Sequence, residues 1–295
     1  DVVVKAPSIR QRGDTISYNV ASFADANDKS LADVLKKMPG IEVSDKGEIK
    51  YNGKAINKFY IEGHDMLGGR YSIATNNIHQ KDVGSVEVMT NHQPIKALED
   101  MSFSQDPAIN IKLKESAKSR LVGTLKAGVG MEQKKGEKFG KLNVWEGEMS
   151  LMRFAKKAQS LNTFKSNNIG TDVTGEGNLL FSDEGTGVMG NSYNLKDYVN
   201  VSDSRVRKNQ THVFTTNNLW VLGKNTDLSS QIVYTHDRLL SSSFSNTQYF
   251  LNDSTIYDVE DEQAKQKQNR LVADFTLTSN GEKAYVANQL SADLT

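Results

Sequence analysis

Residues 121–131 read LVGTLKAGVGM, and their pattern indicates the secondary structure of the larger part of the chain. Leu121, Leu125 and Val129 fall on one face of an extended backbone, while Lys126 and Gly130 fall on the other. Alternation with a period of two is typical of a β-strand that has one face against an apolar environment. The larger part of the chain is therefore predicted to be an antiparallel sheet.

The same alternation recurs toward the C-terminus, for example in residues 228–234 and 271–278. We predict about seven strands, near 119–131, 139–153, 159–169, 209–222, 227–250, 264–278 and 284–295. The second, fourth and sixth connections are tight, whereas the third runs over about 171–208 and is rich in Gly, Asn, Ser and Asp. Short turns at one end and long loops at the other are typical of outer-membrane β-barrels. A soluble sandwich produces the same alternation, although it needs no strands of this length.

Composition narrows the possible functions. The 295 residues carry 36 Lys and Arg against 36 Asp and Glu, a net charge of +0 that argues against a nucleic-acid binder. There are no cysteines, which excludes disulfides, cysteine-ligated metals and cysteine nucleophiles. No stretch approaches the roughly 20 apolar residues that a spanning helix requires. The first residues lack a signal-peptide pattern, so we expect either a cytosolic protein or numbering that begins after processing.

The number of predicted strands bears on the length of the protein. The smallest closed outer-membrane barrel takes about 8 strands of about 10 residues each. About seven strands leave an unpaired edge, and a lipid bilayer does not tolerate such an edge. We therefore expect the sequence to be the N-terminal piece of a longer protein.

The first 115 residues have a different, mixed α/β pattern. Ser30–Met38 spaces its apolar residues as a helix does, and Pro39-Gly40 ends it. Short strands are predicted at 41–43, 48–51, 58–61, 85–89 and 108–113, separated by turn-forming pairs such as Asn52-Gly53.

These segments resemble, in order, the plug domain of TonB-dependent outer-membrane transporters, most closely those of Bacteroidetes-type bacteria. Residues 30–54, SLADVLKKMPGIEVSDKGEIKYNGK, are similar to the opening helix and hairpin of that domain. Residues 59–63, 77–89, 91–98 and 106–114 resemble its later strands and short helix. The resemblance implies an α+β plug domain at 6–115, followed at 119–295 by an antiparallel all-β segment that is an incomplete outer-membrane β-barrel.

The resemblance also implies a function and partners. Asp1, Val2, Val3 and Val4, within a segment 1–5, are similar to the TonB box, which adds as a strand to a periplasmic energy-coupling protein. The plug would gate active import of a large or scarce solute through a barrel of about 22 strands. Gly68, Gly69, Arg70 and Tyr71 are the expected apical contact with that unknown solute. Outer-membrane lipid and a surface lipoprotein are the other implied partners, no cofactor is implied, and the implied location is the outer membrane of a Gram-negative bacterium.

The sequence departs from the family at two positions. Where the family often has arginines that form charged contacts between plug and barrel wall, this chain has Asn52 and Ser85. Glu87 remains as one possible partner of such a contact.

Three other functions have weaker support in the sequence. A soluble two-domain β-rich binding or adhesion module is the alternative to the transporter. A hydrolase would use carboxylates such as Glu146 with Glu148, or Asp172 with Glu176, but no motif singles these pairs out. A metal site would need His64, His79 and His92, whose spacing matches no compact ligand motif.

Overall fold

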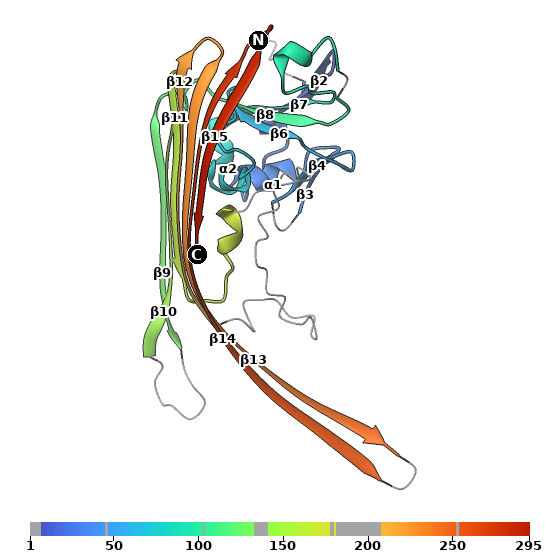
Figure 1. Ribbon diagram of the computed structural model, residues 1–295, viewed down its shortest axis with the longest axis vertical. Helices are drawn as coiled ribbons and strands as arrows, with labels where there is room; N and C mark the ends of the chain where they lie inside the picture. Colours follow the sequence, from blue (N-terminus) through green and yellow to red (C-terminus); the bar gives the residue numbers. More distant parts are fainter. Residues whose placement is uncertain are drawn as a thin grey trace.

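The computed structural model describes residues 7–44, 47–102, 104–132, 141–177, 180, 208–251 and 254–295. These residues form a small α/β domain that lies beside one large antiparallel sheet (Figure 1). None of the helices among them is long and apolar enough to cross a membrane.

The small domain contains two sheets. The first has five strands in the order β1 (Ile9–Arg12), β2 (Thr15–Asn19), β7 (Val83–Met89), β8 (Ala108–Leu113) and β6 (Lys58–Ile61). Its pairs are antiparallel except for β6 with β8, which is parallel. The second has three short strands, β3 (Ile41–Val43), β4 (Ile49–Tyr51) and β5 (Lys54–Ala55). The strands predicted in this region are confirmed. Strands β1, β2 and β5 were not predicted: β1 is exposed along its whole length and so lacks an apolar face, and β5 has only two residues.

Two short α-helices, α1 (Leu31–Leu35) and α2 (Ser72–Asn77), and three 3₁₀ turns complete the small domain. The turns are η1 (Val20–Ser22), η2 (Gln80–Asp82) and η3 (Lys96–Leu98). Helix α1 begins with a capping box, in which Ser30 and Asp33 each accept a hydrogen bond from the other's backbone N–H. Gly40 ends the turn that follows at φ +80°, and a Cβ there would lie 2.7 Å from Asn52 Oδ1. The predicted helix is therefore confirmed, although it is shorter than 30–38.

The large sheet has seven strands in chain order, each antiparallel to its neighbours. They are β9 (Leu121–Glu132), β10 (Lys141–Phe154), β11 (Ala158–Asn167), β12 (Lys208–Gly223), β13 (Thr226–Phe250), β14 (Thr255–Asn280) and β15 (Tyr285–Leu294). The 3₁₀ turn η4 (Thr174–Gly177) follows β11. Within the described residues β9 and β15 are the two edges and do not pair with each other.

The seven predicted strands are confirmed, with one boundary wrong. Strand β14 begins at Thr255 rather than near 264, because residues 255–263 are largely polar and lack the alternation used to find strands. Strands β13 and β14 consequently extend as a long hairpin beyond the rest of the sheet, at the end opposite the tight turns (Figure 1).

The core lies mainly in the small domain and reaches the sheet near its tight turns. Leu31, Leu35, Phe59, Ile73 and Ile109 are among its fully buried side chains. Four side chains of the large sheet join the same cluster: Met152, Phe154, Leu161 and Leu219. The small domain is therefore held to the sheet by apolar packing at one end, and polar contacts hold the rest of the junction.

Candidate functional site: the junction of the small domain with the sheet

The predicted apical loop, residues 68–71, lies in this junction. Gly68 and Gly69 adopt φ +53° and +93°, left-handed values that glycine tolerates without strain. A Cβ on Gly68 would lie 3.4 Å from Gln231 Oε1 of β13, so the loop approaches the sheet closely. Gly68 is exposed, whereas Gly69, Arg70 and Tyr71 are buried.

Arg70 joins the small domain to the sheet. One guanidinium nitrogen lies 2.6 Å from Asp274 Oδ2 of β14, and Nε donates to the carbonyl of Gly177 at 3.1 Å. The Arg70 and Asp274 side chains are 5% and 10% exposed. A buried ion pair must recover the cost of removing both charges from water, so its geometry is under strong constraint. Arg70 is therefore placed as a tether in this structure.

Tyr71 lies in the core of the small domain. Its ring stacks on Phe59 with centroids 5.4 Å apart, and its hydroxyl oxygen accepts a hydrogen bond from the Ile49 backbone N–H at 3.1 Å. Burial raises the pKa of Tyr71 to about 12. A solute contact by Gly68, Gly69, Arg70 and Tyr71 stays a prediction.

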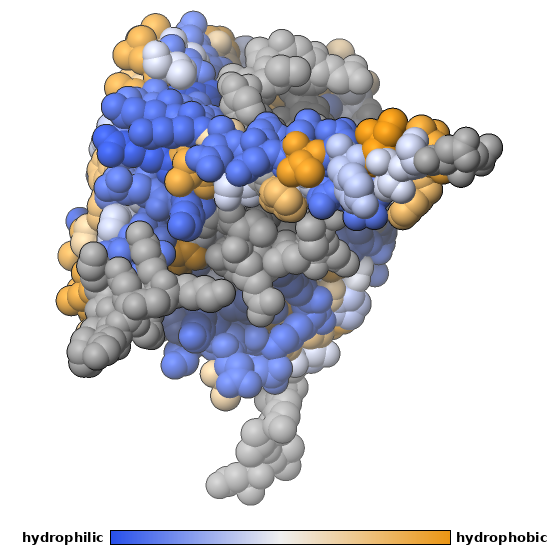
Figure 2. Space-filling view, turned by 90° about the horizontal axis from the view of Figure 1, so that it is seen from below, coloured by the Kyte–Doolittle hydropathy of each residue, from blue (hydrophilic) through white to orange (hydrophobic). Residues whose placement is uncertain are grey.

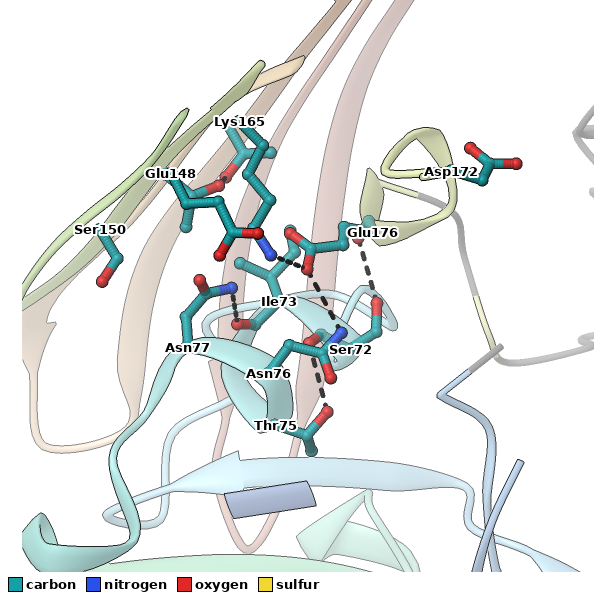
Figure 3. A network of polar contacts seen from close by, with 12 residues as sticks. Ser72, Ile73, Thr75, Asn76, Asn77, Glu148, Ser150, Lys165, Asp172 and Glu176 are labelled. Carbon is teal, nitrogen blue, oxygen red and sulfur yellow. Dashed lines mark hydrogen bonds and ion pairs between the residues drawn. The ribbon is translucent and has the colours of Figure 1, made fainter. Parts of the chain in front are cut away.

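The connection after β11 folds back onto helix α2 (Figure 3). The carboxylate of Glu176, in η4, pairs with Lys165 Nζ of β11 and accepts a hydrogen bond from Asn76 Nδ2 at 3.3 Å. Ser72 Oγ donates to the Glu176 carbonyl at 3.1 Å. Leu180 N also donates to the Gly69 carbonyl at 3.0 Å. The sheet, its η4 connection and the small domain therefore meet in one network.

Further polar contacts lie along strands β11 and β13. Gln231 Nε2 donates to the Met66 carbonyl at 2.7 Å, and Gln159 Nε2 donates to the Ile61 carbonyl at 3.2 Å. His64 Nδ1 lies 2.8 Å from Asp227 Oδ2. These side chains point from the sheet toward the small domain, so the face of the sheet that holds the domain is polar.

That face is polar over most of its width. Its buried polar side chains include Thr163, Lys165, Thr211, Thr215, Asn217, Gln231 and Asp274. Several bond to one another across strands, as Thr163 and Thr215 do through hydroxyls 2.8 Å apart. Because side chains alternate along a strand, the residues between these positions lie on the opposite face.

The opposite face is apolar and exposed. One cross-strand row contains a large apolar residue from every strand, and its members are between 36% and 80% exposed. In sheet order the row is Leu125, Met149, Phe164, Phe214, Tyr234, Leu271 and Leu294. Seen from the hairpin end, hydrophobic residues line one side of the molecule, at the left of the view, and hydrophilic residues cover most of the surface next to them (Figure 2).

Glu87, the expected partner of a charged contact, accepts a hydrogen bond from Asn110 Nδ2 at 2.8 Å and forms no ion pair with another residue that the structure describes. Arg70 and Asp274 were not predicted to meet. The sequence does place Asp274 on the polar face of an alternating strand, which suggests a polar partner. It does not identify Arg70 as that partner, because the two residues are 204 positions apart.

The remaining candidate residues have other partners. Lys126 Nζ lies 2.8 Å from Glu146 and 3.5 Å from Glu148. His79 caps η2, and His92 Nε2 lies 2.8 Å from the Tyr60 hydroxyl. Within the described ranges no group of three His, Cys, Asp or Glu side chains is placed to hold a metal ion. Asp1–Val4 lie outside the described residues.

No family model matches the sequence, and no curated protein matches it. Solved structures that resemble the chain include receptors and transporters, several of them named as proteins of the outer membrane or as siderophore receptors.

Three of these structures illustrate the likeness. The outer-membrane transporter YddB from Escherichia coli is 10% identical with a TM-score of 0.37, over 99% of this chain and 40% of that one. The siderophore receptor PirA from Pseudomonas aeruginosa is 12% identical with a TM-score of 0.33, over 91% and 46%. The ferric-catecholate import receptor Fiu from E. coli K12 is 13% identical with a TM-score of 0.32, over 92% and 47%. The chain spans less than half the length of each, and all three likenesses are distant.

Proposed function

We propose that the chain is part of an outer-membrane active transporter, in which residues 6–115 are the plug and residues 119–295 are the first strands of the barrel. In this proposal further strands close the barrel, and the plug gates import of a large or scarce solute. Residues 1–5 engage a TonB-type coupling protein in the periplasm. The main support for the proposal is the difference between the two faces of the large sheet. The face toward the small domain is mostly polar, and the opposite, exposed face is apolar.

This arrangement of polar and apolar faces is the reverse of that expected for a sheet in a water-soluble protein. A sheet in a soluble protein buries its apolar face and exposes its polar one. Here the row from Leu125 to Leu294 is exposed on all seven strands, whereas Thr, Asn and Gln side chains are buried on the other face. In lipid the outward row contacts acyl chains, and the polar face lines the lumen.

The arrangement does not favour the soluble two-domain alternative. A sandwich packs two sheets face to face with apolar side chains between them. In the part of the chain that the structure describes, the apolar face of the large sheet packs against no second sheet. The small domain lies instead on the polar face, where Gln231, Asp227 and Asp274 contact it.

The membrane part of the proposal is tested by a charge on the outward row. Phe214→Lys places an ammonium group on the lipid face, which costs about 2–4 kcal/mol at the bilayer midplane. Phe244→Lys is the matched control, because Phe244 is exposed in the β13–β14 hairpin beyond the rest of the sheet. We expect the natural full-length protein to fractionate with the detergent-extracted outer membrane, and Phe214→Lys alone to lower its amount there. Equal recovery of both variants, or a wild-type protein in the soluble fraction, would refute the proposal.

The coupling part is tested at the N-terminal segment. Strand addition needs a backbone N–H donor, and proline has none. We expect Val3→Pro to abolish capture of the intact protein by the purified C-terminal domain of a TonB-type protein, with Val3→Ile as the control. Undiminished capture of Val3→Pro would show that this segment does not pair through its main chain.

A further inference from the structure

On strands β12, β13 and β14 the outward face of the sheet changes from apolar to basic within a short distance. Phe214, Tyr234 and Leu271 belong to the apolar row, and the next row toward the hairpin holds His212, His236 and Asn269. Beyond it lie Gln210, Arg238 and Lys267, and then Lys208, Leu240 and Lys265. The change from the apolar row to the row of Arg238 spans four residues, or about 13 Å along a strand.

The basic residues of these two rows lie close to one another across neighbouring strands. Arg238 and Lys267 are direct cross-strand partners, and like charges directly opposite destabilise a sheet. Lys208 and Lys265 flank Leu240 in the following row. All four cations are exposed, and none has an ion pair or hydrogen bond to another residue that the structure describes. The repulsion between them is therefore not compensated within the described sheet.

The nearest acidic side chain in the sequence does not compensate it either. Asp237 precedes Arg238 but points to the opposite face, where its carboxylate accepts a hydrogen bond from Thr211 Oγ1 at 2.6 Å. Asp237 is 8% exposed. A shallow hollow of about 330 Å³ lies among the basic rows. Five of its lining residues belong to the outward-facing rows: Lys208, Gln210, Arg238, Leu240 and Lys265. The other two lining residues, Asn209 and Leu239, lie between these positions along their strands.

We propose that Lys208, Arg238, Lys265 and Lys267 bind the phosphate group of a membrane-lipid headgroup. The proposal rests on the membrane location proposed above, since the apolar row then contacts the acyl chains of the same lipid. A phosphate placed at the boundary of the hydrocarbon region meets Arg238 and Lys267 first. Its charge offsets their repulsion, and the guanidinium offers it two parallel donors.

The test is lipid preference measured on the intact natural protein in detergent micelles. Native mass spectrometry would count bound lipids with phosphatidylglycerol or phosphatidylcholine added at equal mole fraction. The variants are Arg238→Gln/Lys267→Gln, which removes the repelling pair, and Lys156→Gln/Lys157→Gln, which removes two exposed cations at the opposite, tight-turn end. Both variants change only exposed side chains, so folding is not at risk.

We expect the wild type and the Lys156/Lys157 control to prefer phosphatidylglycerol equally. The Arg238/Lys267 variant should lose this preference by roughly 30-fold, at about fivefold for each cation near an anionic surface. Equal preference in all three proteins would overturn the proposal, and so would full displacement of the lipid by inorganic phosphate, because the site would then recognise a free anion. A wild-type protein that stays soluble without detergent would instead overturn the membrane location, which separates that failure from failure of the lipid site.

Discussion

Replacing Asp274 by Asn tests whether the Arg70–Asp274 pair holds the small domain to the sheet. The two side chains are 5% and 10% exposed and 2.6 Å apart, so the change leaves a buried guanidinium without its counter-charge. Removing one partner of a buried pair typically costs about 3–5 kcal/mol. The population of the undocked state should therefore rise by about 100- to 4000-fold, since each 1.4 kcal/mol is a factor of about ten.

Amide hydrogen exchange of α2 in the detergent-solubilised natural protein reports this population. Helix α2 follows Arg70 directly and contacts η4, so undocking exposes its backbone N–H groups. We expect exchange over residues 72–77 to accelerate by the factor above in Asp274→Asn. Asp227→Asn is the matched control, because its pair with His64 is more than a quarter exposed on both sides and such pairs contribute about 0–1 kcal/mol.

A second variant separates charge from packing. Arg70→Met/Asp274→Leu removes both charges together, and replacing a whole buried pair with apolar residues is often neutral or stabilising. We expect its exchange to return most of the way to the wild-type rate. The reasoning is refuted if Asp274→Asn exchanges no faster than Asp227→Asn, or if the double variant exchanges as fast as Asp274→Asn.

Three further outcomes are expected. Gly177→Ala should destabilise the docked η4 turn by about 1–3 kcal/mol, because the new Cβ would lie 2.5 Å from Val233 Cγ1, and Val233→Ala in the same protein should restore the wild-type exchange rate of α2. Tyr71→Phe should lower the melting temperature, at a cost of about 1–3 kcal/mol, because it leaves the buried Ile49 N–H without its acceptor; an unchanged melting temperature would argue against that hydrogen bond. Burial, with a smaller effect of the nearby Lys58, lowers the pKa of His92 from 6.5 to about 4. Between these two pH values His92 is therefore protonated in the unfolded chain and neutral in the folded one. Stability should be full above pH 6.5 and fall as the pH drops toward 4, and His92→Gln should flatten that part of a melting curve measured against pH.

The seven strands of the large sheet could be predicted from the sequence alone. Alternation over residues such as Leu121, Leu125 and Val129 is a local property, since the side-chain period of a strand is fixed by its backbone. The capped start of α1 at Ser30 was readable for the same reason, because a cap involves only residues a few positions apart. Strand β14 was misplaced where its polar first residues carry no such pattern.

The contacts of residues 68–71, in contrast, could not be predicted from the sequence, because they form between distant parts of the chain. Residues 68–71 read as a loop open to a ligand, yet Arg70 and Tyr71 are buried. Their partners, Asp274 and Ile49, lie 204 and 22 positions away, and no local pattern selects them from the other acidic and backbone groups. The exposed apolar row from Leu125 to Leu294 depends likewise on the register of seven strands, because a one-residue slip of any strand would turn its side chains to the opposite face.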